Sequence, residues 1–222
     1  MPVGSQIKII RSRRKTLALS ISADSTIVVK VPWFTPQYFI NQFLNKHDAW
    51  IQSQIAKLQA RTTSGKKKYV NGEPFLYMGM NLLLQIGNYQ EISVVKNKLL
   101  FPNFMLFRAQ KQLTAWYKKQ ARELITRQVD YYGAKMKTTY TGITFSDTKS
   151  QWGSCSKDNK LQFSWRLIMT PWLTLNYVVI HELAHTLEKN HGRPFWDIVR
   201  RYNPSYLIQR KWLKKNGDAL SI

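Results

Sequence analysis

The sequence predicts an α+β fold in which an antiparallel β-rich half, residues 1–104, precedes a helical half, residues 105–222, within a single domain. Short apolar runs separated by turn residues fill the first half, which is the pattern of strands joined by hairpins. Near Phe107 the apolar residues take up a helical period. With 44% hydrophobic residues, the chain can bury a core, either as one domain or as two closely packed halves.

The first three strands are expected between Gln6 and Val31. The apolar runs IKII, TLALSIS and TIVVKV alternate there with the basic stretch Arg11–Lys15 and a polar turn around Asp24. Because the connections are short, we expect the strands to pair in chain order as an antiparallel meander.

Helices and a polar connector follow. Thr35 and Pro36 have the signature of an N-cap and a first helical residue, and a second apolar stripe around Trp50 predicts another helix. His47 lies between the two stripes, where a lone histidine is more often a surface or capping residue than a ligand. The segment RTTSGKKK, Arg61–Lys68, has the composition of an exposed connector.

More β-structure is expected before the longest helix. Between Tyr69 and Leu100, apolar runs broken by Asn71-Gly72 and Gly87-Asn88 predict hairpins. A broad apolar face then predicts one helix from Phe107 to about Tyr132. Two further strands are expected, at Thr139–Phe145 and at Leu161–Met169. Thr170 and Pro171 repeat the helix-start signal and open another helix.

This last helix and the residues after it contain the segment YVVIHELAHTLEKNHGRPFW, Tyr177–Trp196. The segment holds three of the four histidines of the chain, two of them in an HExxH pattern and the third after it. His181 and His185 are four residues apart, so on a helix they share one face, about 6 Å apart along the axis, and can bind one ion. Glu182 lies beside that face. Its place suits a base that acts on water better than it suits a ligand.

His191 requires the helix to end before it. A continued helix would place it roughly 9 Å beyond His185, too far to share a metal ion. We expect Asn190 to adopt the left-handed conformation of a C-cap and Gly192 to make the backbone after the cap flexible. Pro194 is then expected to start another helix. His191 can then fold back as a third ligand. Because a catalytic zinc ion takes three protein ligands and keeps one position open, Zn²⁺ is the expected cofactor.

The segment KSQWGSCS, Lys149–Ser156, lies between the last two predicted strands. Gly153, between Trp152 and small residues, would suit a loop or an edge strand whose backbone approaches another group closely. Cys155 is the single cysteine, so the chain can form no internal disulfide, in agreement with a reducing compartment. A role for Cys155 as ligand or nucleophile is disfavoured, because three imidazoles already complete a zinc site.

The charge of the chain is strongly positive. Its 34 Lys and Arg residues against 12 Asp and Glu residues give a formal net charge of +22. This excess favours polyanions such as nucleic acid or nucleotides, although scattered basic residues also fit an inert basic surface. The expected contributors to non-specific nucleic-acid binding lie in two runs: Arg11, Arg13, Arg14 and Lys15, and Lys66, Lys67 and Lys68.

Nothing in the sequence predicts a membrane location. No stretch approaches eighteen uninterrupted apolar residues, and Met1–Ser20 lacks the phases of a signal peptide. We therefore expect a cytoplasmic protein with no membrane partner.

The motifs KSQWGSCS, FSWRLIMTP, YVVIHELAH and NHGRPFW, in this order and spacing, resemble the YgjP-like metal-dependent hydrolases, relatives of the SprT and WLM metallopeptidase groups. The likeness extends to SRRKTLALSIS and VKVP, so it covers nearly the whole chain. It implies a zincin-like fold with His181, His185 and His191 as zinc ligands and Glu182 as general base and acid. Metzincins share the histidine spacing, but the glycine they place three residues after the second histidine is Glu188 here.

The favoured reaction is peptide hydrolysis, in which Glu182 takes a proton from water and returns it to the leaving amine. Arg166, Tyr202 and Tyr206 are candidate stabilisers of the transition state. The resemblance also implies two alternatives, a metal-dependent nucleoside triphosphate (UTP) pyrophosphatase and a nucleic-acid-associated protease of SprT or WLM type. A nucleic-acid-binding module with a structural metal is disfavoured, because structural zinc usually has four ligands.

Overall fold

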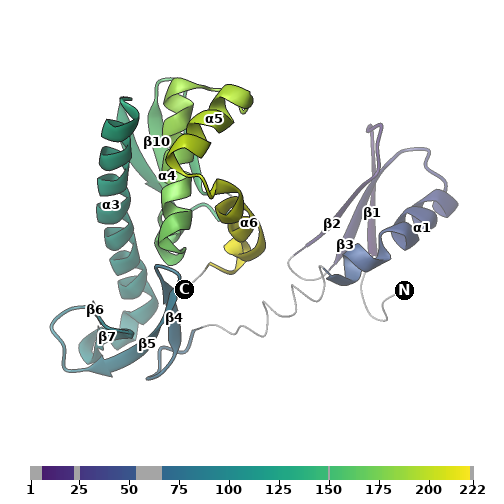
Figure 1. The fold of residues 1–222 in the computed structure, drawn as a ribbon. Helices are drawn as coiled ribbons and strands as arrows, with labels where there is room; N and C mark the ends of the chain where they lie inside the picture. The colour runs from purple at the N-terminus through teal and green to yellow at the C-terminus, as the bar shows by residue number, and fades with distance from the viewer. Residues whose placement is uncertain (1–6, 23–25, 54–66, 150, 221–222) are drawn as a thin grey trace. The chain divides into compact units, whose positions relative to one another are not determined.

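The computed structural model describes residues 7–22, 26–53, 67–149 and 151–220. The chain divides into two compact units, Met1–Lys66 and Lys67–Ile222 (Figure 1). The division falls inside the predicted basic connector, most of which lies outside the described residues. The predicted boundary between the halves, after residue 104, instead falls within the second unit, because four strands before it belong to that unit. The α+β fold class itself is confirmed.

The first unit contains a three-stranded sheet in the order β1-β3-β2, formed by β1 (Ile7–Ser12), β2 (Ala18–Ile21) and β3 (Ile27–Pro32). The predicted antiparallel meander is wrong, because β3 pairs in parallel with β1 and antiparallel with β2. Strand β3 buries every second side chain, which accounts for its central place.

Helix α1 (Gln37–Lys46) packs Ile40 and Leu44 into the core that β3 begins. It starts one residue later than predicted, since Pro36 is the N-cap. His47 is the C-cap residue, and its Nδ1 lies 2.8 Å from the carbonyl oxygen of Phe43, which confirms a capping role. The next helix is described only as far as residue 53, and its predicted later residues lie outside the described part of the chain.

The second unit begins with a four-stranded sheet in the order β4-β5-β7-β6, formed by β4 (Pro74–Tyr77), β5 (Met80–Gly87), β6 (Ser93–Val95) and β7 (Lys98–Pro102). Strands β4 and β5 pair antiparallel, and so do β6 and β7, as expected for hairpins. The hairpin predicted from the turn signal Gly87-Asn88 does not form, because β5 and β6 are not neighbours in the sheet. The parallel pairing of β5 with β7 was not predicted. The short helix η1 (Asn103–Arg108) then leads to the long helix.

A second sheet has the order β8-β10-β9, with β8 (Gly142–Ser146), β9 (Gly153–Cys155) and β10 (Lys160–Ser164). The strand predicted over Leu161–Met169 ends at Ser164, and η2 (Trp165–Met169) continues as a 3₁₀ helix. Most side chains of η2 are buried, so the segment shows no alternation that could separate a strand from a helix.

Four helices complete the second unit: α3 (Ala109–Met136), α4 (Trp172–Leu187), α5 (Arg193–Tyr202) and α6 (Tyr206–Asn216), followed by η3 (Gly217–Ala219). Helix α3 is the longest, as predicted, but it ends at Met136 instead of Tyr132. Helix α4 lies beside α3 and also contacts α5, α6 and β9 (Figure 1). Such a helix must be apolar on most sides, and ten of its residues are buried. No described helix is long and apolar enough to cross a membrane.

The turn between β4 and β5 docks onto the segment that precedes α4. The backbone N–H of Met78 donates to the carbonyl of Ile168 at 2.8 Å, and that of Gly79 donates to the carbonyl of Met169 at 3.0 Å. Gly79 has a φ of +77°, and a Cβ atom there would lie 2.9 Å from Cα of Pro171. The turn thus fixes the chain at the start of α4.

We predict that Gly79→Ala lowers the free energy of unfolding by about 1–3 kcal/mol, because it adds this contact to an unfavourable φ. Urea unfolding followed by circular dichroism measures the loss. Gly72→Ala is the control, since Gly72 has a φ of +83° but no atom within 4 Å of the added Cβ. Equal losses in the two variants would show that close packing on Pro171 contributes nothing.

Candidate metal centre

Three histidines meet near the C-terminal end of α4. The ring centroids of His181 and His185, one helical turn apart, are separated by 5.0 Å. The ring of His191 lies 5.0 Å from the first and 4.6 Å from the second. One nitrogen of each ring lies within 4.8 Å of the others, and no other such group of His, Cys, Asp or Glu side chains occurs among the described residues. The structure therefore brings together the three predicted ligands.

The chain reverses after α4 in a different way from the one predicted. The helix ends at Leu187, and Glu188 is extended, with φ −138° and ψ 113°. The predicted left-handed C-cap at Asn190 is wrong, since Asn190 is not among the residues with positive φ and Gly192 has a φ of −75°. An extended residue already turns the chain away from the helix axis, so no left-handed residue is required. Helix α5 then begins at Arg193, with Pro194 in its first turn.

Neighbouring groups fix the orientation of the rings. Nδ1 of His185 lies 3.2 Å from the carbonyl oxygen of Glu188, which leaves Nε2 for the cluster. The indole N–H of Trp196 donates to the carbonyl of His191 at 3.0 Å. The buried ring of Phe195 packs against all three imidazoles, with centroid distances of 4.9, 4.5 and 4.6 Å. Rings held in this way retain their geometry when a ligand binds.

The electrostatics of the cluster fit a cation. Burial, together with the neighbouring His185 and His191, lowers the pKa of His181 to about 3. Burial also lowers the pKa of His185. For these two rings burial favours the neutral form, which is the form that binds metals. Nε2 of His181 lies only 3.1 Å from Nε2 of His191, so the two ring nitrogens converge on one position, as the donors of a divalent metal ion must.

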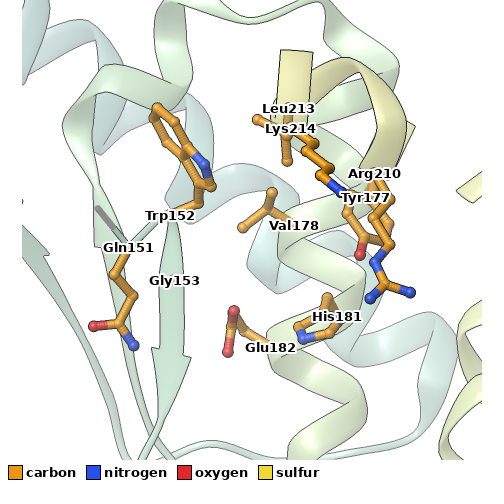
Figure 2. A pocket seen from close by; sticks show the side chains of 10 residues that line it. All are labelled: Gln151, Trp152, Gly153, Tyr177, Val178, His181, Glu182, Arg210, Leu213 and Lys214. Carbon is orange, nitrogen blue, oxygen red and sulfur yellow. The ribbon is translucent and has the colours of Figure 1, made fainter. Parts of the chain in front are cut away.

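Glu182 is buried directly beside the histidines and beneath the backbone of β9. A Cβ atom at Gly153 would lie 2.6 Å from Cγ and from Oε1 of Glu182, so no side chain fits at that position. The sequence predicted a close backbone approach at Gly153, and the group approached is the glutamate. Burial raises the pKa of Glu182 to about 8. Its carboxyl group faces the same pocket as the ring of His181 (Figure 2).

Two pockets meet at His181 and Glu182. The first, which we call the Trp152 pocket, has a volume of about 370 Å³ and lies between the start of β9, helix α4 and helix α6. The second, the Cys155 pocket, has a volume of about 340 Å³ and also contains His185, His191 and Lys189. A substrate can therefore approach the histidines from two sides.

The predicted transition-state stabilisers do not line either pocket. The guanidinium of Arg166 donates to the carbonyl of Asp147 at 2.6 Å and lies over the ring of Trp165. Tyr206 is buried and stacks on Trp196 with a centroid distance of 5.3 Å. Tyr202 is the last residue of α5.

Tyr177 and Arg210 line the Trp152 pocket, and sequence reasoning missed both. The only available signal was the four-residue spacing of Arg210 and Lys214 on a helix, which does not say where their side chains point.

Cys155 lines the Cys155 pocket but does not belong to the three-histidine group. Its Sγ lies 3.8 Å from Nζ of Lys189, and burial raises the pKa of the thiol. A neutral thiol is a poor ligand and a poor nucleophile, in agreement with the sequence-based expectation.

Part of the positive charge has a structural role. The guanidinium of Arg11 donates to the carbonyls of Trp33 and Thr35 at 2.9 and 2.8 Å. Nζ of Lys67 donates to the carbonyl of Pro74 at 2.6 Å. Both side chains belong to the runs predicted to bind a polyanion, and Lys66 lies outside the described residues.

Comparison with known proteins places the chain in a family. The family model described as YgjP-like, metallopeptidase domain, matches residues 15–216. The structure is similar to the metallopeptidase zymogen abylysin of Pyrococcus abyssi, with a TM-score of 0.38 and 16% identity over 41% of this chain and 93% of that one. It is also similar to the metallopeptidase zymogen jannalysin of Methanocaldococcus jannaschii, with a TM-score of 0.35 and 24% identity over 41% and 95%. No curated protein matches the sequence. Because the family match spans most of the chain, the protein belongs to the YgjP-like metallopeptidase family and is a metal-dependent hydrolase.

Proposed function

We propose that the protein is a zinc-dependent peptidase in which His181, His185 and His191 hold the metal and Glu182 acts as general base and general acid. The observation that carries the proposal is the meeting of three imidazoles with a buried carboxyl group. Burying a carboxylate is costly unless a cation or a proton compensates it, and a metal site next to it supplies that compensation.

The donor set suits zinc, which prefers imidazole nitrogen and keeps one position open when three protein ligands bind it. Zinc bound there supplies a lowered pKa for a coordinated water and polarisation of a substrate carbonyl. Glu182 removes a proton from the attacking water and returns it to the leaving amine. Burial favours the protonated form of Glu182, and a neighbouring cation opposes this effect, so the carboxyl group can both take and return a proton near neutral pH.

Strand β9 offers a place for an extended peptide. It lies at the edge of its sheet, with β10 on one side, and its backbone borders the Cys155 pocket together with the three histidines. A peptide that hydrogen-bonds to a free strand edge is held by its main chain, so binding does not depend on one side chain. Such pairing would place successive carbonyl groups of the substrate along the pocket that contains Glu182.

The position of the Glu182 carboxylate under Gly153 gives a testable expectation. Gly153→Ala should lower peptide hydrolysis at least tenfold while zinc content is retained, because the added methyl group displaces the carboxylate and not the imidazoles. Initial rates and metal analysis measure the two effects. Gly142→Ala, on β8, is the control and should leave the rate nearly unchanged, because the added Cβ has no atom within 4 Å and Gly142 lines neither pocket. Equal rates for Gly153→Ala and wild-type protein would contradict a catalytic role for the buried carboxylate.

The reaction class is tested with the zinc-loaded protein. Incubation with a mixture of peptides, followed by mass spectrometry, should reveal internal cleavage products that Glu182→Gln does not produce. UTP is incubated in parallel, and pyrophosphate release is measured. Release of pyrophosphate while every peptide stays intact would contradict the peptidase proposal and favour the nucleotide reaction.

A further inference from the structure

The Trp152 pocket joins the proposed catalytic centre to two cations that form no ion pair within the described part of the chain. Figure 2 shows Arg210 and Lys214 reaching in from α6, while Trp152 and Gly153 lie on the opposite side and His181 and Glu182 lie at one end. Neither cation has a carboxylate within 4.0 Å among the described residues, and the only carboxylate that lines the pocket is Glu182. Two free cations beside a reaction centre mark a place for an anionic group of the substrate.

Arg210 lies against an aromatic ring that is hydrogen-bonded to the third proposed ligand. Its guanidinium carbon lies 5.2 Å from the centroid of the Trp196 ring. The indole N–H of Trp196 in turn donates to the carbonyl of His191, the third proposed ligand. A guanidinium seated on an aromatic face loses little further freedom on binding, and its planar fork fits a carboxylate with two parallel hydrogen bonds. Arg210 is therefore preorganised to receive a carboxylate.

Much of the remaining wall of the pocket is apolar. Trp152, Val178 and Leu213 form this part, and Gln151 and Tyr177 also line the pocket. The indole of Trp152 is held from behind by the backbone of Gly217, where a Cβ atom would lie 2.7 Å from the ring. An apolar wall next to two cations fits a side chain whose methylene groups are followed by a carboxylate. The volume of about 370 Å³ is ample for one such side chain.

We propose, on the basis of the peptidase function proposed above, that the Trp152 pocket selects peptides with a carboxylate close to the scissile bond, through Arg210 and Lys214. A glutamate side chain fits the pocket best, because its methylenes can pack on Trp152 while its carboxylate reaches α6. A free C-terminal carboxylate offers the same chemistry.

Binding tests this selection without relying on catalysis. Zinc-loaded Glu182→Gln protein is titrated into fluorescein-labelled alanine-glycine peptides that differ at one position, which is Glu, Gln or Lys, with C-terminal amides throughout. The Glu peptide should bind at least tenfold more tightly than the Gln peptide, since a charge-assisted hydrogen bond is lost in the latter. A second set of peptides has free C-terminal carboxylates and no Glu. Tight binding of this set would identify the C-terminal carboxylate as the group bound, and tight binding of the amidated Glu peptide alone would identify the side chain.

Variants then assign the effect to residues. Adding Arg210→Ala should remove most of the preference for Glu, and Arg210→Glu should shift it towards the Lys peptide. Lys215→Ala, also on α6 but outside the pocket, is the matched control and should keep the full preference. Equal binding of all peptides, binding of none, or a preference that survives Arg210→Ala with Lys214→Ala would contradict the inference.

Cleavage by wild-type protein separates this inference from the proposed function. If the cleavage rate does not depend on acidic residues or free carboxylates in the peptide, the proposed peptidase function is supported and the proposed selection for a carboxylate is wrong. A carboxylate preference in binding, without cleavage of any peptide, would overturn the peptidase function and support the pocket as an anion site.

Discussion

Replacing Glu182 with glutamine should leave zinc bound and the fold intact, while peptide hydrolysis falls by a factor of about 10²–10⁴. The amide has the shape of the carboxylate, so the close packing under Gly153 is kept. It cannot accept a proton from water, and it removes none of the three imidazoles. Metal analysis, circular dichroism and initial rates measure the three properties separately.

Glu188→Gln is the matched control for this variant, because Glu188 also lies next to the histidines. Its contact with His185 is made by the backbone carbonyl, which the substitution does not change. The control should therefore retain both zinc and most of the activity. Loss of zinc from Glu182→Gln would mean that Glu182 is a ligand, and the proposed division of roles would then be wrong.

The second large effect is expected at His191. His191→Ala should weaken zinc binding by about 10²-fold or more, since loss of a ligand should cost at least as much as loss of a group that only orients one. Titration against a chromophoric chelator measures the affinity. The variant should also lose the stabilisation that zinc gives to the wild-type protein in thermal unfolding.

His47→Ala is the control for His191→Ala, because His47 caps α1 in the first unit and should not affect zinc affinity. Full zinc retention by His191→Ala would remove His191 from the ligand set. It would direct attention to Glu188 or Asp197, the carboxylates nearest to His191 in the sequence on either side.

The histidine cluster could be predicted because it depends mostly on local rules. The four-residue spacing of His181 and His185 fixes their common face, and the reach of a metal ion limits where His191 can lie. The backbone conformation with which the chain reverses after α4 could not be predicted in the same way. Asn190 and Gly192 have the composition of a left-handed cap, but an extended Glu188 performs the turn.

The strand pairing shows the limit of local patterns. The alternation in Ile27–Pro32 predicts a half-buried strand, but it does not say which strand lies on each side. The parallel pairing of β1 with β3, and of β5 with β7, depends on contacts between distant segments. Hairpins between consecutive strands were expected, and they form for β2 with β3, β4 with β5 and β6 with β7, but not for β1 with β2 or β5 with β6.

The pocket residues show the same limit at the candidate site. Gly153 could be predicted as a close approach because a glycine among small residues signals it. The partner of that approach depends on how β9 packs on α4, and the role of Arg210 depends on how α6 packs there. Arg166 was a candidate stabiliser of the transition state, but its guanidinium donates to the carbonyl of Asp147.

The most direct test is a zinc titration of metal-stripped wild-type protein, followed by the rate of peptide cleavage. The stripped protein should be inactive, and the rate should rise in proportion to added zinc until about one ion per chain is bound, because three histidines form one site. Zinc-loaded Glu182→Gln should remain inactive at every point of the titration. Peptide cleavage by the stripped protein at the full rate, or by Glu182→Gln at the wild-type rate, would contradict a zinc-dependent peptidase with Glu182 as its base.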